Sequence, residues 1–137
     1  MKKLNHTIVL LAATTLFWAT LSSIIAQAQV VLAPGFNPDP KPIATGTSGG
    51  SKNSGDCGSI SSAPNLQLQL TEQFTYLRFS VQGAGQPTLL IEGPTGRFCG
   101  LAQPEISGFW NPGTYNIYVG DRAGGQHQFS LSVTKNP

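Results

Sequence analysis

Apolar and polar residues alternate along the second half of the chain, and this alternation is its strongest structural signal. A period of two is produced by a β-strand that buries one of its two faces. The apolar members of the alternating runs are Leu66, Leu68 and Leu70; Leu77, Phe79 and Val81; Tyr115, Ile117 and Val119; and Phe129, Leu131 and Val133. The half-buried strands that we predict from them span residues 66–70, 77–82, 114–119 and 129–133.

Shorter or more uniformly apolar runs complete the β pattern. Residues 88–92 are apolar enough for a central strand, and a turn at 93–96 returns the chain as a hairpin partner at 97–99. Two more short strands are expected at 57–60 and 106–110. About seven or eight strands separated by Gly/Pro turns, with no helical period, predict an all-β domain. We expect a small antiparallel β-sandwich of jelly-roll or Greek-key-like type, because two facing sheets bury the alternating residues from both sides.

The N-terminal segment has the features of an export signal. A basic start, Met1-Lys2-Lys3, precedes an apolar run over residues 8–25, and Ala26-Gln27-Ala28 matches the Ala-x-Ala cleavage signature. We predict a signal peptide over residues 1–28. The alternative is an uncleaved membrane anchor, because the apolar run approaches the roughly 18–20 residues that span a bilayer. Cleavage after Ala28 would release the protein from the membrane into the periplasm or the extracellular space.

Residues 29–56 are rich in Pro, Gly, Ser and Thr. Few apolar side chains are available there to offset the entropy cost of ordering the chain. We therefore predict a mostly disordered linker, stiff in its Pro-rich half and flexible in its Gly-rich half. The alternative is that Val30-Val31-Leu32 adds a strand to the edge of a sheet. The β domain is expected to span residues 57–135.

The chain has two cysteines, Cys57 and Cys99. Export would place them in an oxidising compartment, so we expect a disulfide between them. For a loop of this length, loop-closure entropy suggests about 4 kcal/mol of stabilisation before any native strain. No metal site is expected, because two Cys and one His beyond the signal peptide supply too few ligands.

Charge offers little attraction to nucleic acid, since only 10% of the residues are charged. Beyond residue 28, basic and acidic side chains balance. The basic residues are Lys41, Lys52, Arg78, Arg97, Arg122 and Lys135, and the acidic residues are Asp39, Asp56, Glu72, Glu92, Glu105 and Asp121. Nucleic-acid binding requires several Lys or Arg side chains on one face, so a nucleic-acid partner is not expected.

Two short strings resemble the nucleophile loops of chymotrypsin-like proteases. Gly46-Thr-Ser-Gly-Gly50 has the serine version and Gly55-Asp-Cys-Gly58 the cysteine version. That chemistry also needs a His that takes the proton of the nucleophile and a carboxylate that orients the His. His127 lies downstream of both strings, whereas the protease order places the His upstream, and we expect His127 on the surface at a strand edge. We therefore predict no catalytic residues in these strings.

The acidic residues form no catalytic pair in the sequence. Glu72, Glu92, Glu105 and Asp121 each stand alone in or beside a turn. A two-carboxylate hydrolase would have to assemble them in three dimensions. A small hydrolase that uses Glu92 or Glu105 is therefore a further alternative for the function, in addition to the two hypotheses given at the end of this subsection.

The alternation of side chains along the strand at 114–119 predicts a candidate ligand-binding surface. Thr114, Asn116 and Tyr118 share the face opposite the predicted core. Trp110 directly follows Phe109, so one of the two faces the core and the other faces solvent. Core packing is the ordinary role of Trp110; the alternative places it beside Tyr118, where flat rings with polar neighbours suit stacking against sugars. The candidate surface therefore consists of Trp110, Thr114, Asn116 and Tyr118.

Several motifs together resemble a known module. Leu89-Leu-Ile-x-Gly-Pro-x-Gly96 is followed by Cys99, by Gly113-x-Tyr-x-Ile-x-Val-Gly120 and by Phe129-x-Leu-x-Val133. This series is similar to the bacterial pre-peptidase C-terminal domain, a β-sandwich. The resemblance covers about residues 32–134 and implies a module that is itself non-catalytic.

The lead-in adds to the resemblance. Pro34-Gly-Phe-x-Pro-Asp-Pro40, followed by the string at 46–50, looks like the start of exported cyanobacterial proteins built around a similar module. Some such modules bind polymers or matrix, sometimes with Ca²⁺. Relatives carry acidic residues where this chain has Gln86-Pro87 and residues 100–103, so the ligands that a hard cation needs are missing there. We expect neither Ca²⁺ nor another cofactor.

These inferences lead to one main hypothesis and one structural alternative. The protein is expected to be an exported, non-catalytic binding module whose partner is a protein or polysaccharide of the cell envelope or matrix. The alternative is an inert structural or accessory protein of the envelope.

Overall fold

The computed structural model describes residues 28–101 and 103–137, which form strands and no helix. The predicted signal peptide, apart from Ala28, lies outside the described residues. The strands are β1 (Gln29–Leu32), β2 (Lys41–Thr47), β3 (Lys52–Asn53), β4 (Ser59–Ile60), β5 (Leu66–Leu70), β6 (Phe74–Gly83), β7 (Pro87–Gly93), β8 (Gly96–Gly100), β9 (Glu105–Trp110), β10 (Gly113–Asp121) and β11 (Gln128–Thr134). The all-β class is confirmed, and each of the strands predicted from the sequence is present.

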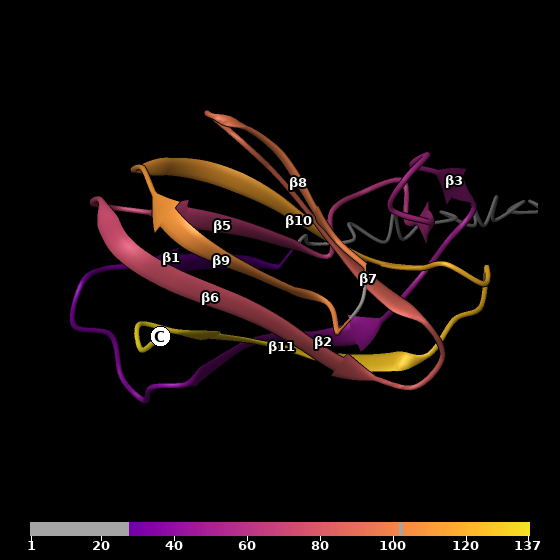
Figure 1. The fold of residues 1–137 in the computed structure, drawn as a ribbon, viewed down its shortest axis with the longest axis horizontal. Coiled ribbons are helices and arrows are strands. Elements are labelled where there is room, and N and C mark those ends of the chain that lie inside the picture. Colours follow the sequence, from indigo (N-terminus) through magenta and orange to yellow (C-terminus); the bar gives the residue numbers. More distant parts are fainter. Residues whose placement is uncertain (1–27, 102) are drawn as a thin grey trace, which may run out of the picture.

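The strands form two facing sheets, visible as two layers in Figure 1. The seven-stranded sheet has the order β1-β5-β10-β4-β3, with β7 paired to β10 and β8 paired to β7. The four-stranded sheet has the order β2-β11-β6-β9. The pairs are antiparallel except β1 and β5, which run parallel.

The strand order is that of a jelly roll. If β2 and β5 to β11 are numbered from one to eight along the chain, the four-stranded sheet has the order 1-8-3-6 and its partner the order 2-7-4-5. This is the double Greek key of a jelly roll. The predicted antiparallel sandwich is therefore confirmed, and β1, β3 and β4 extend the seven-stranded sheet.

The alternating apolar residues meet between the two sheets, as the parity argument predicts. All the apolar positions of the four alternating runs belong to one buried cluster. Leu89 and Ile91 of β7 join it, while Leu90 between them faces the opposite side of the sheet. Each sheet therefore presents an inner face to this core and an outer face away from it.

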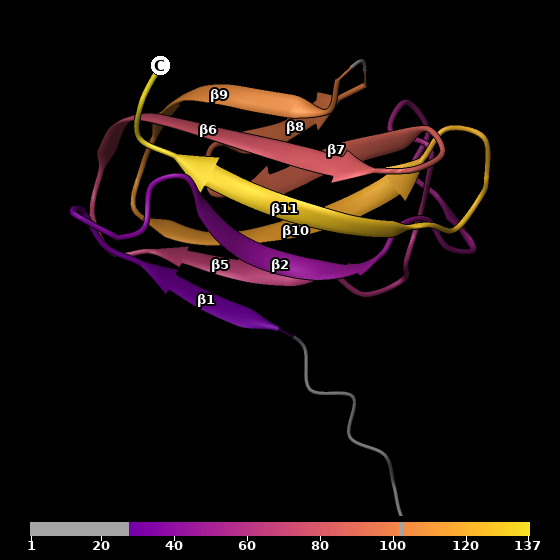
Figure 2. The same cartoon turned by 90° about the horizontal axis from the view of Figure 1, so that it is seen from below.

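The prediction of a disordered linker is wrong, because residues 29–56 contain β1, β2 and β3. Its few apolar side chains are used fully: Leu32, Phe36 and Ile43 are buried in the main core. β2 pairs with β11 and supplies the first strand of the jelly roll. β1 pairs with β5 and lies at the rim of the sandwich (Figure 2). The sheet-edge alternative for Val30-Val31-Leu32 is therefore confirmed, and the domain begins well before residue 57.

Two glycines of the same stretch serve close packing rather than flexibility. A Cβ on Gly49 would collide with the carbonyl oxygen of Gly125, and one on Gly50 with that of Ile60. Gly49 also has a φ of 75°, in the left-handed region that glycine adopts without steric cost. Its backbone N–H donates to the carbonyl of Val119 at 2.9 Å. A Gly-rich composition therefore marks a tight junction here.

Candidate functional site

The structure divides the predicted ligand-binding surface. Thr114 is exposed and Asn116 is half-buried, and both lie on the outer face of the seven-stranded sheet, as predicted. Tyr118 lies on the same face of β10 but is only 8% exposed, and Trp110 is only 4% exposed. The prediction that Trp110 and Tyr118 present their rings to a ligand is therefore wrong.

Tyr118 is covered because residues 54–60, which we call the Cys57 segment, fold over its strand. The ring packs with Cys57, Ile60 and Leu90 in a second, smaller cluster, to which Cys99 also contributes. Burial raises the pKa of the Tyr118 hydroxyl, and the negative charge of nearby Glu92 raises it further. Parity places Tyr118 on the outer face, but only the position of the Cys57 segment removes it from solvent.

Trp110 lies in the main core, which is the core-packing interpretation. Its indole N–H donates to the carbonyl of Leu77 at 3.2 Å. The rings of Phe79, Tyr115 and Phe98 lie 5.0, 5.4 and 5.6 Å from it in edge-to-face arrangements, which aromatic quadrupoles favour. Its neighbour Phe109 is 55% exposed, so the predicted split between these two residues is confirmed.

The outer face of the seven-stranded sheet carries a cross-strand row of carboxamides. Gln29 on β1 is aligned with Gln67 on β5, and Gln67 with Asn116 on β10. The Gln67 amide N–H donates to the Asn116 side-chain oxygen at 3.5 Å. We call Gln29, Gln67 and Asn116 the amide row. Glu92 on β7 and Arg97 on β8 continue the same line across the sheet.

A shorter row runs beside the amide row. Val31 on β1 is aligned with Gln69 on β5, and Gln69 with Thr114 on β10. All three side chains are exposed, and that of Val31 is 57% exposed. The two rows together form a face without charge on these three strands. Since neighbouring strands lie roughly 4.8 Å apart, each row spans about 10 Å.

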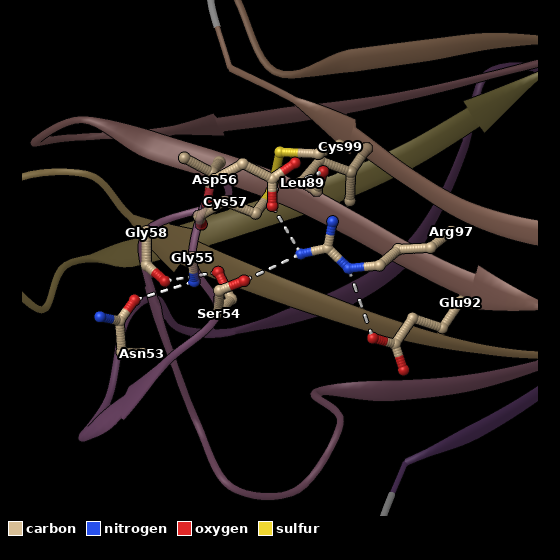
Figure 3. The surroundings of a disulfide bond; sticks show 11 residues. Asn53, Ser54, Gly55, Asp56, Cys57, Gly58, Leu89, Glu92, Arg97 and Cys99 are labelled. Atoms are coloured by element: carbon tan, nitrogen blue, oxygen red, sulfur yellow. Dashed lines mark hydrogen bonds and ion pairs between the residues drawn. A yellow bond between two sulfur atoms is a disulfide. The ribbon is translucent and has the colours of Figure 1, made fainter.

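Arg97 closes the far end of the line by contacting the Cys57 segment (Figure 3). Its guanidinium lies 2.8 Å from the Asp56 carboxylate and 3.8 Å from that of Glu92. It also donates to the carbonyl of Ser54 at 3.1 Å. The hydrogen bond and the positive charge of Arg97 hold the pKa of Asp56 below its usual value, and the pKa of Arg97 is raised in turn. Arg97 and the disulfide of Cys99, both on β8, thus attach the Cys57 segment to this strand.

The predicted disulfide between Cys57 and Cys99 is present, with the two Cα atoms 5.8 Å apart. Cys57 is fully buried. The cysteine-containing string at 55–58 therefore holds a bridged sulfur, and its role in the described structure is to attach the covering segment to β8.

The serine-containing string lies in a polar junction at one end of the sandwich. Ser48, Asp121 and His127 contribute to it, which are the residue types of a hydrolase triad. However, Ser48 is 1% exposed, and its hydroxyl accepts the backbone N–H of His127 at 3.2 Å. The Ser48 N–H in turn donates to the His127 carbonyl at 2.8 Å. Ser48 therefore joins two loops and presents no accessible nucleophile, and His127 is half-buried in this junction rather than on an open strand edge.

Asp121 is the buried carboxylate of this junction, with 0% of its surface exposed. Burial alone would raise its pKa. Backbone N–H groups of Ala123, Gln86 and Gly125 donate to it at 2.7, 3.2 and 3.3 Å. These bonds, together with the charge of His127, outweigh burial and hold the pKa of Asp121 below its ordinary value. All the donors belong to loops, so Asp121 fixes the loop geometry at this end.

The remaining candidate groups stay apart. Glu92 lies on the seven-stranded sheet, whereas Glu105 lies on the four-stranded sheet and pairs with Arg78 at 3.6 Å. Residues 28–101 and 103–137 contain no cluster of three His, Cys, Asp or Glu side chains placed to hold a metal. They also enclose no pocket.

Comparison with known proteins identifies a relative in a cyanobacterium. An uncharacterised protein of Synechococcus elongatus is 50% identical over 98 residues, which cover 66% of this chain and 72% of that protein. This chain belongs to the same family. No family model and no solved structure matches it.

No helix in the part of the chain that the structure describes is long and apolar enough to cross a membrane. The Cys57–Cys99 disulfide is compatible with an oxidising location outside the cytosol.

Sequence reasoning missed two members of the amide row. The sequence pattern places Gln29 in the predicted linker, and it gives no ligand-binding role to Gln67. The alternation at 66–70 does place Gln67 and Gln69 on an outer face. It does not show which strands lie beside β5, and the row exists only because β1 and β10 do.

Proposed function

We propose that the protein is an exported, non-catalytic module that binds a polymer of the cell envelope or matrix, with a glycan as the favoured ligand and a protein as the alternative. The amide row is the observation that carries this proposal. The similarity to the pre-peptidase C-terminal module supports the non-catalytic role, and the Ala-x-Ala leader and the disulfide support export.

The chemistry of the amide row suits a hydroxyl-rich ligand. Each carboxamide offers N–H donors and a carbonyl acceptor, and a sugar hydroxyl likewise donates and accepts. Gln29, Gln67 and Asn116 repeat this pair of functions on three neighbouring strands. The row carries no charge, so a neutral polysaccharide fits it better than a charged polymer. The adjacent Thr114 and Gln69 extend the same chemistry.

A binding assay with variants on opposite sheets tests the proposal. Neutral polysaccharide and protein fractions prepared from a cyanobacterial envelope serve as immobilised probes. The variant Gln67→Ala/Asn116→Ala should bind the polysaccharide about 30-fold more weakly, since it removes two hydrogen-bonding side chains and each lost hydrogen bond contributes about 1 kcal/mol. The matched control is Gln82→Ala/Ser132→Ala on the outer face of the four-stranded sheet, which should bind normally.

Three outcomes distinguish the hypotheses. Equal binding by the amide-row variant and the wild type would show that the ligand contacts another surface. Retention on the protein fraction alone would replace the glycan with a protein partner. No retention on either fraction would contradict the binding role and favour an inert structural protein of the envelope.

A further inference from the structure

Strand β1 begins at the first residue beyond the predicted cleavage site. The carbonyl of Ala28 accepts the backbone N–H of Gln67 at 2.8 Å. Gln29, the next residue, is aligned with the same Gln67. The peptide bond that a signal peptidase would cut therefore belongs to the pairing that attaches β1 to the sheet.

Cleavage changes the chemistry at this position. It removes the Ala28 carbonyl and leaves the α-amino group of Gln29 in its place. An α-amine has a pKa of roughly 7.7–8.0 and is mostly protonated at neutral pH. An ammonium group beside the N–H of Gln67 sets donor against donor, because neither group can accept a hydrogen bond. The mature strand would thus exchange a favourable contact for an unfavourable one.

The side chain of Gln29 is free to remove this charge. It is exposed on the outer face of the sheet. Within residues 28–101 and 103–137, no hydrogen bond from another side chain or loop holds its carboxamide. An N-terminal glutamine can close a five-membered ring between its own amine and its own side chain, and β1 lies at the rim of the sandwich (Figure 2).

We propose that Gln29 is a modification site: after signal cleavage it cyclises to pyroglutamate. This inference rests on the exported, cleaved form of the proposed function. The neutral α-nitrogen attacks the side-chain carbon Cδ, the Nα–Cδ bond forms and the Cδ–Nε2 bond breaks. The nitrogen Nε2 leaves as ammonia and carries away one proton of the amine. No oxidant, reductant or cofactor takes part, and the product is a neutral lactam.

The product removes the conflict at the sheet edge. The lactam nitrogen carries no charge. In the ring it is bonded to a carbonyl carbon, just as it was bonded to the carbonyl carbon of Ala28 before cleavage. Cyclisation consumes the carboxamide of Gln29, so the mature amide row keeps the carboxamides of Gln67 and Asn116 beside a neutral lactam on β1. Cyclisation therefore leaves the outer face without the charge that cleavage alone would introduce.

Mass spectrometry of the exported protein tests the inference. The full chain, leader included, is expressed in a cyanobacterium and the mature form is isolated. Its intact mass should equal that of residues 29–137 with the disulfide formed, less one molecule of ammonia. N-terminal sequencing should be blocked, and pyroglutamyl aminopeptidase should remove one residue and expose Val30. The control Gln29→Asn keeps an exposed carboxamide that is too short to form this ring, and it should give a free N-terminus.

The outcomes separate this inference from the proposed function. A mature chain that begins at Gln29 and keeps a free amine after prolonged incubation at neutral pH would overturn the modification site and leave export intact. A cleaved chain that begins at another residue would likewise overturn only the modification site. A chain that keeps its leader would overturn the cleavage on which both proposals rest.

Discussion

Trp110 and Phe109 show how strongly the environment of single residues differs along one strand. Trp110 contacts three aromatic rings and donates a hydrogen bond to Leu77, whereas Phe109, the preceding residue, is 55% exposed. Both are large aromatic residues on β9, so their difference isolates the effect of burial.

The pair gives a matched test of the core. Trp110→Ala should lower the free energy of unfolding by about 3–5 kcal/mol, because it removes a buried ring and leaves a cavity. Phe109→Ala should change it by less than about 0.5 kcal/mol, as surface substitutions usually do. Urea unfolding followed by circular dichroism measures both. Comparable losses for the two variants would contradict the assignment of the inner and outer faces of β9.

Asp121 makes a prediction about pH. Its folded pKa lies below the ordinary value of 3.8. Between the folded and the ordinary pKa the unfolded chain binds more protons, so the stabilisation by Asp121 is present above pH 3.8 and is lost as the pH falls through the folded pKa. Asp121→Asn should reduce this loss. The substitution should also cost about 1–3 kcal/mol at neutral pH, since it leaves a backbone N–H facing an amide N–H.

Chemical denaturation at a series of acidic pH values measures the effect of Asp121. Glu72→Gln removes an exposed carboxyl and serves as the control for the loss of one negative charge. If the wild type and Asp121→Asn lose stability in parallel as the pH falls, the loop contacts of Asp121 do not carry the stabilisation assigned to them.

At the scale of elements, the segment around Cys57 acts as a cover for part of the seven-stranded sheet. It buries Leu90 and Tyr118 on a face that would otherwise meet solvent. The disulfide and the contacts of Arg97 attach it to β8 (Figure 3).

Removal of the disulfide should loosen this cover. Cys57→Ala/Cys99→Ala should lower the free energy of unfolding by about 4 kcal/mol, the loop-closure value. The three tyrosines then report where the structure opens when the protein is treated with a nitrating reagent. Tyr118 should become reactive in the variant, Tyr115 should stay protected, and the half-buried Tyr76 should react in both proteins. Nitration of Tyr115 as well would mean global unfolding rather than release of the cover.

The N-terminal strands make a second prediction at this scale. A mature chain that begins at Ala33 lacks β1, which is an edge strand, and should fold with reduced stability. A chain that begins at Ser48 also lacks β2, the first strand of the jelly roll, and should not fold because β11 loses a partner on one side. Dispersion of amide resonances in NMR spectra separates the cases. A well-folded chain beginning at Ser48 would restore the linker interpretation.

At the scale of the whole molecule, the balance of charge makes a prediction about the salt dependence of the proposed binding. Beyond residue 28, the chain has six basic and six acidic side chains, and the amide row is uncharged. Binding through that row should therefore change by less than about threefold between about 50 and 200 mM salt. A polymer held by many phosphate contacts would lose a factor of roughly 10³–10⁵ over the same range. Titration of the envelope fractions at both salt concentrations measures this, and a steep loss would indicate an anionic ligand.

The sequence by itself determined the inner faces of the strands and the disulfide. The alternation at Leu66, Tyr115 and Phe129 is a local property of the chain, because a strand turns successive side chains to opposite sides. The two cysteines left no other pairing within the chain. The strand positions between residues 57 and 135 followed from the same local patterns and from the Gly/Pro turns between them.

Only the tertiary structure decided what lies over an outer face. Tyr118 and Asn116 have the same parity on β10, yet one is covered by the Cys57 segment and the other is not. The sequence pattern did not predict the ordering of residues 29–56 for a related reason. The few apolar residues of this stretch are buried by partners distant in the sequence, such as β11 and β5. Coverage and strand neighbourhood are non-local, so composition and periodicity cannot reveal them. The amide row is the clearest product of that non-local arrangement.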